Sequence, residues 1–256
     1  MSSIATSTSS AYNLEKYTLQ QLRDMAREMG LRSRRSKTEM INDISDAFQE
    51  YETYYKEKIE RYTRIRQLGN KGKEGITYLV VDNEASSQEF AMKTFRKTKS
   101  SVTLKKEYKL QKRAGKAGIA PNVYTYDTVS KYILMDVMDK HLIDVICEQK
   151  GTLYKYQQKR LLEIFRILDE IGVFHGDANI ANYMVKDKEI YLIDYGFAKE
   201  IDDRLIKSLK TKTPNSELML LAFVLKLKDM KCEPSAYKYL IPNISEEDRK
   251  KFNLEN

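Results

Sequence analysis

Two short segments in the second half of the chain carry the residues best suited to chemistry. The segment VFHGDANIANYMV contains His175, Asp177 and Asn182, between a long helical pattern and an apolar strand. The segment IYLIDYGFAKE places Asp194 at the end of another apolar strand, two residues before a glycine. Asp177 is suited to accepting the proton of an incoming hydroxyl, and Asn182 to facing a metal. Asp194 is suited to coordinating Mg²⁺ that bridges nucleotide phosphates.

A lysine and a glutamate in the first half form a second candidate group. Lys93 lies in the strand-like run EFAMKTF, where it shares a face with Ala91. A lysine that points inward there can bind nucleotide phosphates if a carboxylate holds it in place. Glu107 is the only acidic residue between Phe90 and Tyr126, a stretch with ten Lys or Arg. We expect Lys93 and Glu107 to pair; the alternatives are a solvated edge lysine and an ion pair within the helix.

Three glycines separate two predicted strands in LGNKGKEGITYLVV: Gly69, Gly72 and Gly75. Glycines let backbone amides approach phosphates closely, and a strand-turn-strand setting suits a lid over a nucleotide. A plain hairpin explains the same residues. A dinucleotide-binding or P-loop glycine run would instead lead into a helix, which this sequence does not predict.

Taken in order, these features resemble the eukaryotic-type protein kinase family over about residues 62–230. The resemblance rests on the glycine turn, the strand lysine, the helix glutamate, the H-x-D-x-x-x-x-N segment and DYG. It implies an α+β, two-lobed fold, with an N-lobe and hinge at 62–138 and a reduced C-lobe at 139–256. It implies ATP and Mg²⁺ as cofactors, Asp177 as catalytic base, and Asn182 and Asp194 as metal ligands. It also implies that the hinge (135–138) meets adenine through backbone amides, which assigns Asp136 and Met138 to the nucleotide site.

The chain departs from the family pattern at several positions. Gly176 replaces the usual arginine of the catalytic loop, and Asn179 stands where Ser/Thr kinases commonly carry a lysine. Loss of that cation would lower transition-state stabilisation unless Lys199 or a basic substrate compensates. The segment after Asp194 is short and lacks an APE motif, which predicts a missing or rebuilt peptide platform. We expect Glu217, in the following apolar helix, to anchor the catalytic loop.

The first 61 residues predict a separate N-terminal part. Residues 1–13 are rich in Ser, Thr and Ala and are expected to be a disordered tail. Residues 14–50 predict two short helices around the basic connector RSRRSK, and residues 51–61 a charged linker helix. The helical pair resembles a SAP motif, which implies DNA binding through phosphates. A docking or dimerising helical pair is the alternative.

Charge and composition predict the kind of partner and the cellular location. The formal net charge of +8 favours anionic partners without naming one. The two cysteines form no metal or disulfide pattern, and the sequence shows neither a secretion signal nor an apolar run long enough for a membrane. These features predict an intracellular protein of the cytoplasm or nucleus, or of a host cell or virion if viral, with no membrane partner. The oligomeric state stays open.

The combined interpretation is a serine/threonine protein kinase that acts on nucleic-acid-associated proteins. The sequence His175-Gly176-Asp177 and the reduced C-lobe also resemble the KEOPS and RIO kinases. This resemblance predicts, as the alternative, a protein that uses ATP hydrolysis as a switch. The minimal kinases of large DNA viruses are equally compact, and a DNA-binding module would suit a kinase of that type. A DNA-tethered kinase-fold scaffold and a small-molecule phosphotransferase remain as further interpretations.

Overall fold

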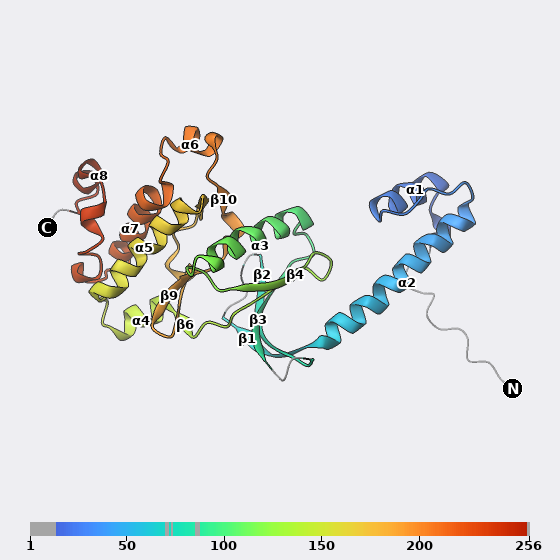
Figure 1. Ribbon diagram of the computed structural model, residues 1–256, viewed down its shortest axis with the longest axis horizontal. Helices are drawn as coiled ribbons and strands as arrows, with labels where there is room; N and C mark the ends of the chain where they lie inside the picture. Colours follow the sequence, from blue (N-terminus) through green and yellow to red (C-terminus); the bar gives the residue numbers. More distant parts are fainter. Residues whose placement is uncertain (1–13, 70–71, 73, 85–87, 255–256) are drawn as a thin grey trace. The chain divides into compact units, whose positions relative to one another are not determined.

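The chain divides into two compact units, Met1–Tyr62 and Thr63–Asn256, in a computed structural model (Figure 1). The structure describes residues 14–254 apart from 70, 71, 73 and 85–87, and only the backbone of residues 28 and 50–60. The predicted tail at residues 1–13 therefore lies outside the described residues. No described helix combines the length and apolarity needed to cross a membrane.

The N-terminal unit is built from two helices, α1 (Leu19–Glu28) and α2 (Lys37–Arg61). Thr18 starts α1 with a capping box, in which its hydroxyl accepts from the Gln21 amide while the Gln21 side chain accepts from the Thr18 amide. Gly30 follows the helix with φ +74°, a conformation that glycine adopts at low cost, so the predicted helix end is confirmed. The apolar faces of the two helices meet in a small core of Leu22, Ala26, Met40 and Ile44, which Leu14 of a preceding 3₁₀ turn completes.

Helix α2 differs from the sequence prediction. The sequence suggested a short helix ending near residue 50 and a separate linker helix, whereas the structure has one continuous helix of 25 residues. Ser36 caps its start by accepting from the Glu39 amide. No glycine or proline interrupts the sequence between residues 37 and 61, so nothing in it breaks the helix.

The second unit begins with a five-stranded sheet in the order β1-β2-β3-β5-β4. The central strand β3 is antiparallel to β2 on one side and to β5 on the other, and this register sets Lys93 opposite Thr77 and Ile133. Helix α3 (Ser101–Lys116) packs against β4 and lies beside the sheet in Figure 1. The strand bounds are β1 Tyr62–Leu68, β2 Gly75–Asp82, β3 Glu89–Phe95, β4 Val123–Asp127 and β5 Tyr132–Met135.

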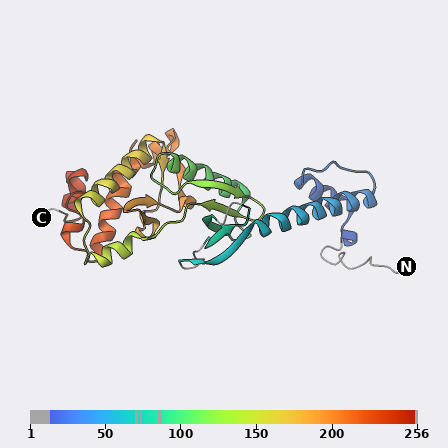
Figure 2. The ribbon, with the colours of Figure 1, turned by 60° about the horizontal axis from the view of Figure 1, so that its bottom comes forward.

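The rest of this unit is mainly helical, which confirms the predicted two-lobed α+β fold. A three-stranded sheet in the order β6-β8-β9 and the pair β7–β10 supply the loops that carry polar residues. Helices α5 and α7 lie side by side in both ribbon views (Figures 1 and 2). The bounds are β6 Lys140–His141, α4 Leu142–Glu148, α5 Lys155–Glu170, β7 Val173–Phe174, β8 Tyr183–Lys186, β9 Glu189–Leu192, β10 Lys199–Glu200, α6 Asp203–Leu209, α7 Leu220–Asp229 and α8 Glu246–Lys251.

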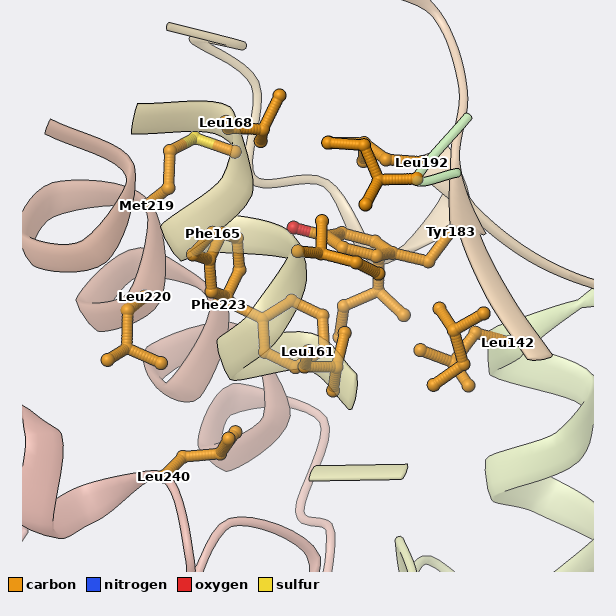
Figure 3. Close-up of a cluster of buried hydrophobic side chains, with 14 of the residues drawn as sticks. Leu142, Leu161, Phe165, Leu168, Tyr183, Leu192, Met219, Leu220, Phe223 and Leu240 are labelled. Carbon is orange, nitrogen blue, oxygen red and sulfur yellow. The ribbon is translucent and has the colours of Figure 1, made fainter. Parts of the chain in front are cut away.

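An aromatic cluster fills the core of the helical lobe (Figure 3). Phe223 of α7 packs edge-on against Phe165 of α5, with ring centroids 6.2 Å apart, and against Tyr183 of β8 at 4.8 Å. All three side chains are buried. Since Tyr183 directly follows the segment that contains Asp177 and Asn182, this core holds one end of that segment in place.

Candidate active site

Lys93 lies between two carboxylates that come from distant parts of the sequence. Its Nζ is 2.7 Å from Glu107 Oε1 of α3 and 2.7 Å from Asp194 Oδ1, which follows β9. The ion pair predicted between Lys93 and Glu107 is therefore present. Only 14% of the Lys93 side chain and 1% of the Glu107 side chain are exposed, so solvent screens this pair weakly.

The pKa values follow from this arrangement. Burial alone would lower the pKa of the Lys93 ammonium, but the carboxylates of Glu107 and Asp194 outweigh it and raise the pKa above its ordinary value. Burial would likewise raise the pKa of the Asp194 carboxyl, but the adjacent Lys93 lowers it. Both groups are thus held in their charged forms at neutral pH, as binding of phosphate and metal requires.

A second lysine and a third carboxylate extend the network. Lys99 Nζ lies 2.5 Å from Glu107 Oε2 and 2.6 Å from Glu74 Oε2, with 7% of its side chain exposed. Glu107 therefore binds a different lysine through each oxygen. Sequence reasoning did not identify Lys99 or Glu74, because Lys99 is one of ten cations in its stretch and the interaction depends on tertiary packing. Glu74, Glu107 and Asp194 lie close enough to share a cation, but Lys93 and Lys99 already bind these carboxylates.

Asp177 is fixed by two hydrogen bonds from its own loop. The Asn182 Nδ2 donates to Asp177 Oδ2 at 2.9 Å, and the Asn179 amide donates to Oδ1 at 3.0 Å. The Asn179 side chain accepts from the Ala181 amide and thereby caps a short 3₁₀ turn. This turn brings Asn182 back toward Asp177, so the spacing of five residues has a direct geometric reason.

His175 joins the two loops. Its ring nitrogens lie 3.1 Å from the Asp177 carbonyl and 3.0 Å from the carbonyl of Ile193, the residue before Asp194. The Ile193 amide also donates to the Asn182 carbonyl at 2.8 Å. The structure thus brings Asp177, Asn182 and Asp194 together, and Asp194 extends the group to Lys93 and Glu107.

Burial lowers the pKa of the His175 imidazole below its ordinary value, which gives a testable dependence of stability on pH. The unfolded chain gains a proton near pH ~6.5 while the folded chain does so only at lower pH. The free energy of unfolding should therefore fall as pH drops below this value, by at most about 1.4 kcal/mol per pH unit for one proton. Urea denaturation between pH 8 and 5 measures this effect. The His141→Gln variant should keep the same pH slope; loss of the slope in that variant would assign it to His141 instead.

The loop that carries Asp177 is anchored by Asn215, not by the predicted Glu217. The Asn215 side chain is buried, accepts from the His175 amide at 3.1 Å, and donates to Asp169 Oδ1 at 2.7 Å and the Val173 carbonyl at 2.8 Å. Glu217 instead accepts from the hydroxyls of Thr211 and Thr213, at 2.7 and 2.6 Å. The prediction chose the acid over the amide, but this position requires a group that both donates and accepts, which an ionised carboxylate cannot do.

Gly69, Gly72 and Gly75 each have a different structural environment. Gly69 has φ +66°, which favours glycine. A side chain on Gly75 would place its Cβ 2.0 Å from the Thr94 carbonyl oxygen, so this glycine permits the close pairing of β2 with β3. The Gly72 amide donates to the Gly75 carbonyl at 2.9 Å. Their role as a phosphate-binding turn stays a prediction, and residues 70, 71 and 73 lie outside the described part.

The predicted adenine contact through the Asp136 amide needs revision. That amide already donates to the Asn122 carbonyl at 3.0 Å, so it is not free for a ligand in this structure. The Asp136 carboxylate accepts from the Asn122 amide at 2.9 Å and from the Tyr124 hydroxyl at 2.5 Å, which raises the pKa of Tyr124 to about 12. The Met138 amide has no hydrogen-bond partner among the described residues, so it remains suited to the predicted role.

Two oxygens of this group fit a hard divalent cation. Within the part of the chain that the structure describes, neither Asn182 Oδ1 nor Asp194 Oδ2 accepts a hydrogen bond, while the other polar atoms of both side chains are engaged. Carboxylate and amide oxygens are the ligands that Mg²⁺ prefers. The donor set therefore matches the metal that the sequence predicts.

Comparisons with known proteins agree with this geometry. The family model described as the protein kinase domain matches residues 62–215. The probable serine/threonine-protein kinase YbdM of Bacillus subtilis (strain 168) is 23% identical over 160 residues, which cover 58% of this chain and 62% of that protein. The KEOPS complex subunit Bud32 of Pyrococcus abyssi (strain GE5 / Orsay) is 28% identical over 108 residues, covering 39% of this chain and 46% of that protein. The matches thus span less than two thirds of either relative.

Proposed function

Because the chain belongs to the protein kinase domain family, we propose that it is an ATP- and Mg²⁺-dependent protein kinase that phosphorylates serine or threonine hydroxyls. One observation carries the proposal: Lys93 contacts both Glu107 and Asp194, and His175 links the Asp194 loop to Asp177. A lysine, an aspartate and an asparagine with oxygens that are free among the described residues, and a second aspartate in one place support the proposal, because phosphoryl transfer requires a cation for phosphate, ligands for a metal and a base.

Each residue then has a defined task. Lys93, oriented by Glu107, binds the phosphates of the nucleotide, and Asn182 and Asp194 hold the metal. Bound Mg²⁺ would neutralise charge on the phosphate oxygens. Asp177 accepts the proton of the substrate hydroxyl and orients it toward the phosphoryl group, while Asn182 and the Asn179 amide keep its carboxylate in place.

The test is phosphate transfer by the full chain with radiolabelled ATP and Mg²⁺, using casein and histone as acceptors. We expect label on the acceptor proteins, and acid hydrolysis should recover it as phosphoserine or phosphothreonine. Label recovered only as phosphotyrosine would overturn the proposed specificity. Release of inorganic phosphate without labelled protein would overturn protein phosphorylation itself.

That last outcome would favour a second candidate, ATP hydrolysis as a conformational switch. Asn179 supports this alternative, because its side chain caps the 3₁₀ turn and supplies no cation to the catalytic loop. The similarity to Bud32, a KEOPS complex subunit, points in the same direction. Lys199, the predicted substitute cation, is exposed on β10.

Lys99 should act as a positioning residue for this site. The Lys99→Met variant leaves one oxygen of Glu107 without its cation and releases Glu74, so we expect kcat/KM to fall roughly tenfold. The Lys99→Arg variant should recover most of that loss. The control is Lys97→Met, an exposed lysine two residues away, which should be close to wild type. Equal rates for Lys99→Met and Lys97→Met would contradict the assignment.

For the N-terminal unit we propose DNA binding through the connector between α1 and α2, as in SAP-like modules. Two of its four cations are engaged: Arg34 with Asp43 at 2.7 Å, and Lys37 with the Glu15 carbonyl at 2.7 Å. Arg32 and Arg35 are exposed and have no ion pair among the described residues. They are therefore the side chains available for phosphates, and DNA-bound proteins are the proposed substrates.

Replacing Arg32 and Arg35 by Ser should lower the slope of log Kd against log salt by about 1.8 for duplex DNA, near 0.9 for each phosphate that is no longer neutralised. Fluorescence anisotropy of a labelled duplex measures this slope. The same variant should phosphorylate a DNA-bound acceptor more slowly while treating free casein as wild type does. The control variant replaces Lys159 and Lys238, both exposed in the other unit, by Ser. Equal slopes for the two variants would remove the connector from the DNA-binding surface.

A further inference from the structure

The sequence Tyr-Lys-Tyr occurs twice in the helical lobe, at residues 154–156 and 237–239. The first segment begins α5, and the second directly follows a short 3₁₀ turn that comes after α7 (Figure 1). Three of the four tyrosines are exposed to solvent: 55% of Tyr154, 52% of Tyr156 and 39% of Tyr239. Large aromatic side chains that the core does not use, gathered from two segments, indicate a surface with a ligand of its own.

A buried glutamine links the two segments. The Gln158 side chain is fully buried, and its amide group donates to the carbonyls of Leu153 and Ser235, each at 2.7 Å. Its oxygen accepts from the Tyr239 amide at 2.8 Å. Both hydrogens and the oxygen of the amide are therefore engaged, so the second segment is fixed against the first turn of α5. The exposed rings thus stand on a defined backbone.

The rings and the lysines of the two segments alternate on the surface. The rings of Tyr154 and Tyr156 stack, with centroids 6.2 Å apart and planes inclined by 30°. Lys155 Nζ lies 5.1 Å from the centroid of the Tyr239 ring, which brings the two segments into contact. Lys155 and Lys238 are exposed, and neither forms an ion pair within the part of the chain that the structure describes. We call these three tyrosines and two lysines the tyrosine patch.

This combination of side chains indicates the chemistry of the ligand. Exposed aromatic faces accept planar groups by stacking, and lysines without an acidic partner attract anions. A single nucleic-acid strand offers both, because unpaired bases present their faces and a phosphate follows each base. In a duplex the bases are already stacked on one another, so a duplex presents few faces to the rings. An acidic peptide would use the lysines but has no planar groups for the tyrosines.

We propose that the tyrosine patch binds single-stranded nucleic acid, with bases stacked on the tyrosine rings and phosphates beside Lys155 and Lys238. This surface is distinct from the duplex-binding connector, and its binding does not depend on phosphate transfer. Helix α5 has 16 residues and is about 24 Å long, and the patch lies at its start, whereas the loop with Asp177 comes after its end. A bound strand would therefore leave the kinase site open.

The test uses the full chain with Arg32→Ser and Arg35→Ser, so that the connector does not contribute. The probes are fluorescein-labelled oligothymidylate and oligouridylate of about 12 nucleotides, followed by anisotropy. We expect binding, and the tighter probe assigns DNA or RNA as the ligand. Adding Tyr154→Leu with Tyr156→Leu should raise Kd at least about tenfold, because leucine keeps apolar bulk but loses the stacking face. Adding Tyr154→Phe with Tyr156→Phe should leave Kd within about twofold, because phenylalanine keeps the ring.

A lysine variant tests the phosphate contact separately. In the same background, Lys155→Ala should reduce the steepness of log Kd against log salt by about 0.7, the value for one phosphate on a single strand. Lys97→Ala, at an exposed lysine of the other lobe, is the matched control and should keep the slope. Equal slopes for these two variants would remove Lys155 from the surface.

Failure of both oligonucleotides to bind would overturn the proposal, and so would equal Kd values for the Leu and Phe variants. Binding of a repeated Asp-Asp-Leu peptide, lost in the Leu variant while neither oligonucleotide binds, would overturn it in favour of a protein partner. Phosphorylation of free casein should be unchanged in all these variants, which also shows that they fold. A chain that binds the strands but transfers no phosphate would contradict the proposed kinase function and leave this surface in place.

Discussion

The Asp177→Asn variant is expected to lower kcat for phosphate transfer by about 10²–10⁴-fold, the usual contribution of a general base. Asparagine has the same shape as aspartate and can still accept from the Asn179 amide, but it cannot take a proton from the substrate hydroxyl. Nucleotide affinity should change less than kcat does, because Lys93 and Asp194 are retained. The measurement is single-turnover transfer to casein alongside nucleotide binding by calorimetry.

The Asp177→Asn substitution also affects Asn182. Its Nδ2 donates to Asp177 Oδ2, and an asparagine at position 177 would present a second donor there. Rotation of the Asn182 amide restores the hydrogen bond but turns its oxygen away from the metal. The Asp177→Ala variant removes this conflict and should show a similar loss of kcat. Asp229→Asn, at an exposed position at the end of α7, is the matched control. Near-wild-type transfer by both Asp177 variants would remove this residue from the chemistry.

The Lys93→Met variant should reduce kcat/KM for Mg·ATP roughly 100-fold, because the nucleotide loses a charge-assisted hydrogen bond and Asp194 loses its cation. The melting temperature should change much less than activity does. Glu107 is only 1% exposed and would be costly to leave unpaired, but Lys99 still binds its other oxygen. Steady-state kinetics and thermal unfolding of the same preparation separate the two effects.

The double variant Lys93→Met with Lys99→Met provides the contrast. Both lysines that bind Glu107 are then absent, so the buried carboxylate must ionise without a partner or take up a proton. We expect a loss of about 3–5 kcal/mol in the free energy of unfolding, which is typical for a broken buried ion pair. Lys97→Met is the control for each single variant. If Lys93→Met alone destabilises the protein as much as the double variant, Lys99 does not support Glu107.

Local patterns in the sequence predicted the core of the site well. Asp177, Asn182 and Asp194 come at strand ends or tight turns close in sequence, so their proximity follows from one hairpin. The pairing of Lys93 with Glu107 was predicted because an isolated acid in a basic helix is unusual. These interactions are present in the structure, while the catalytic roles of the residues remain predictions.

The parts that were missed depend on tertiary packing or on hydrogen-bonding detail. Lys99 is indistinguishable from its basic neighbours until the fold brings Glu74 and Glu107 beside it. The anchoring role of Asn215 depends on tertiary structure. The fold brings the His175 amide, which needs an acceptor, close to the Asp169 carboxylate, which needs a donor, and the Asn215 side chain serves both. The sequence predicts two helices where the structure has the single helix α2, because the apolar pattern changes near residue 50. Helix propensity, however, continues without interruption.

The shared carboxylate of Glu107 also bears on how such a chain can evolve. In a site with a single lysine, substitution of that lysine would strand a buried charge and endanger the fold. Here Lys99 already neutralises the second oxygen, so catalysis could be lost by one substitution at Lys93 while the folded chain survives. Descendants of this chain could therefore drift into non-catalytic binding proteins without first acquiring compensating mutations, and loss of Lys93 in such a descendant would not predict an unstable protein.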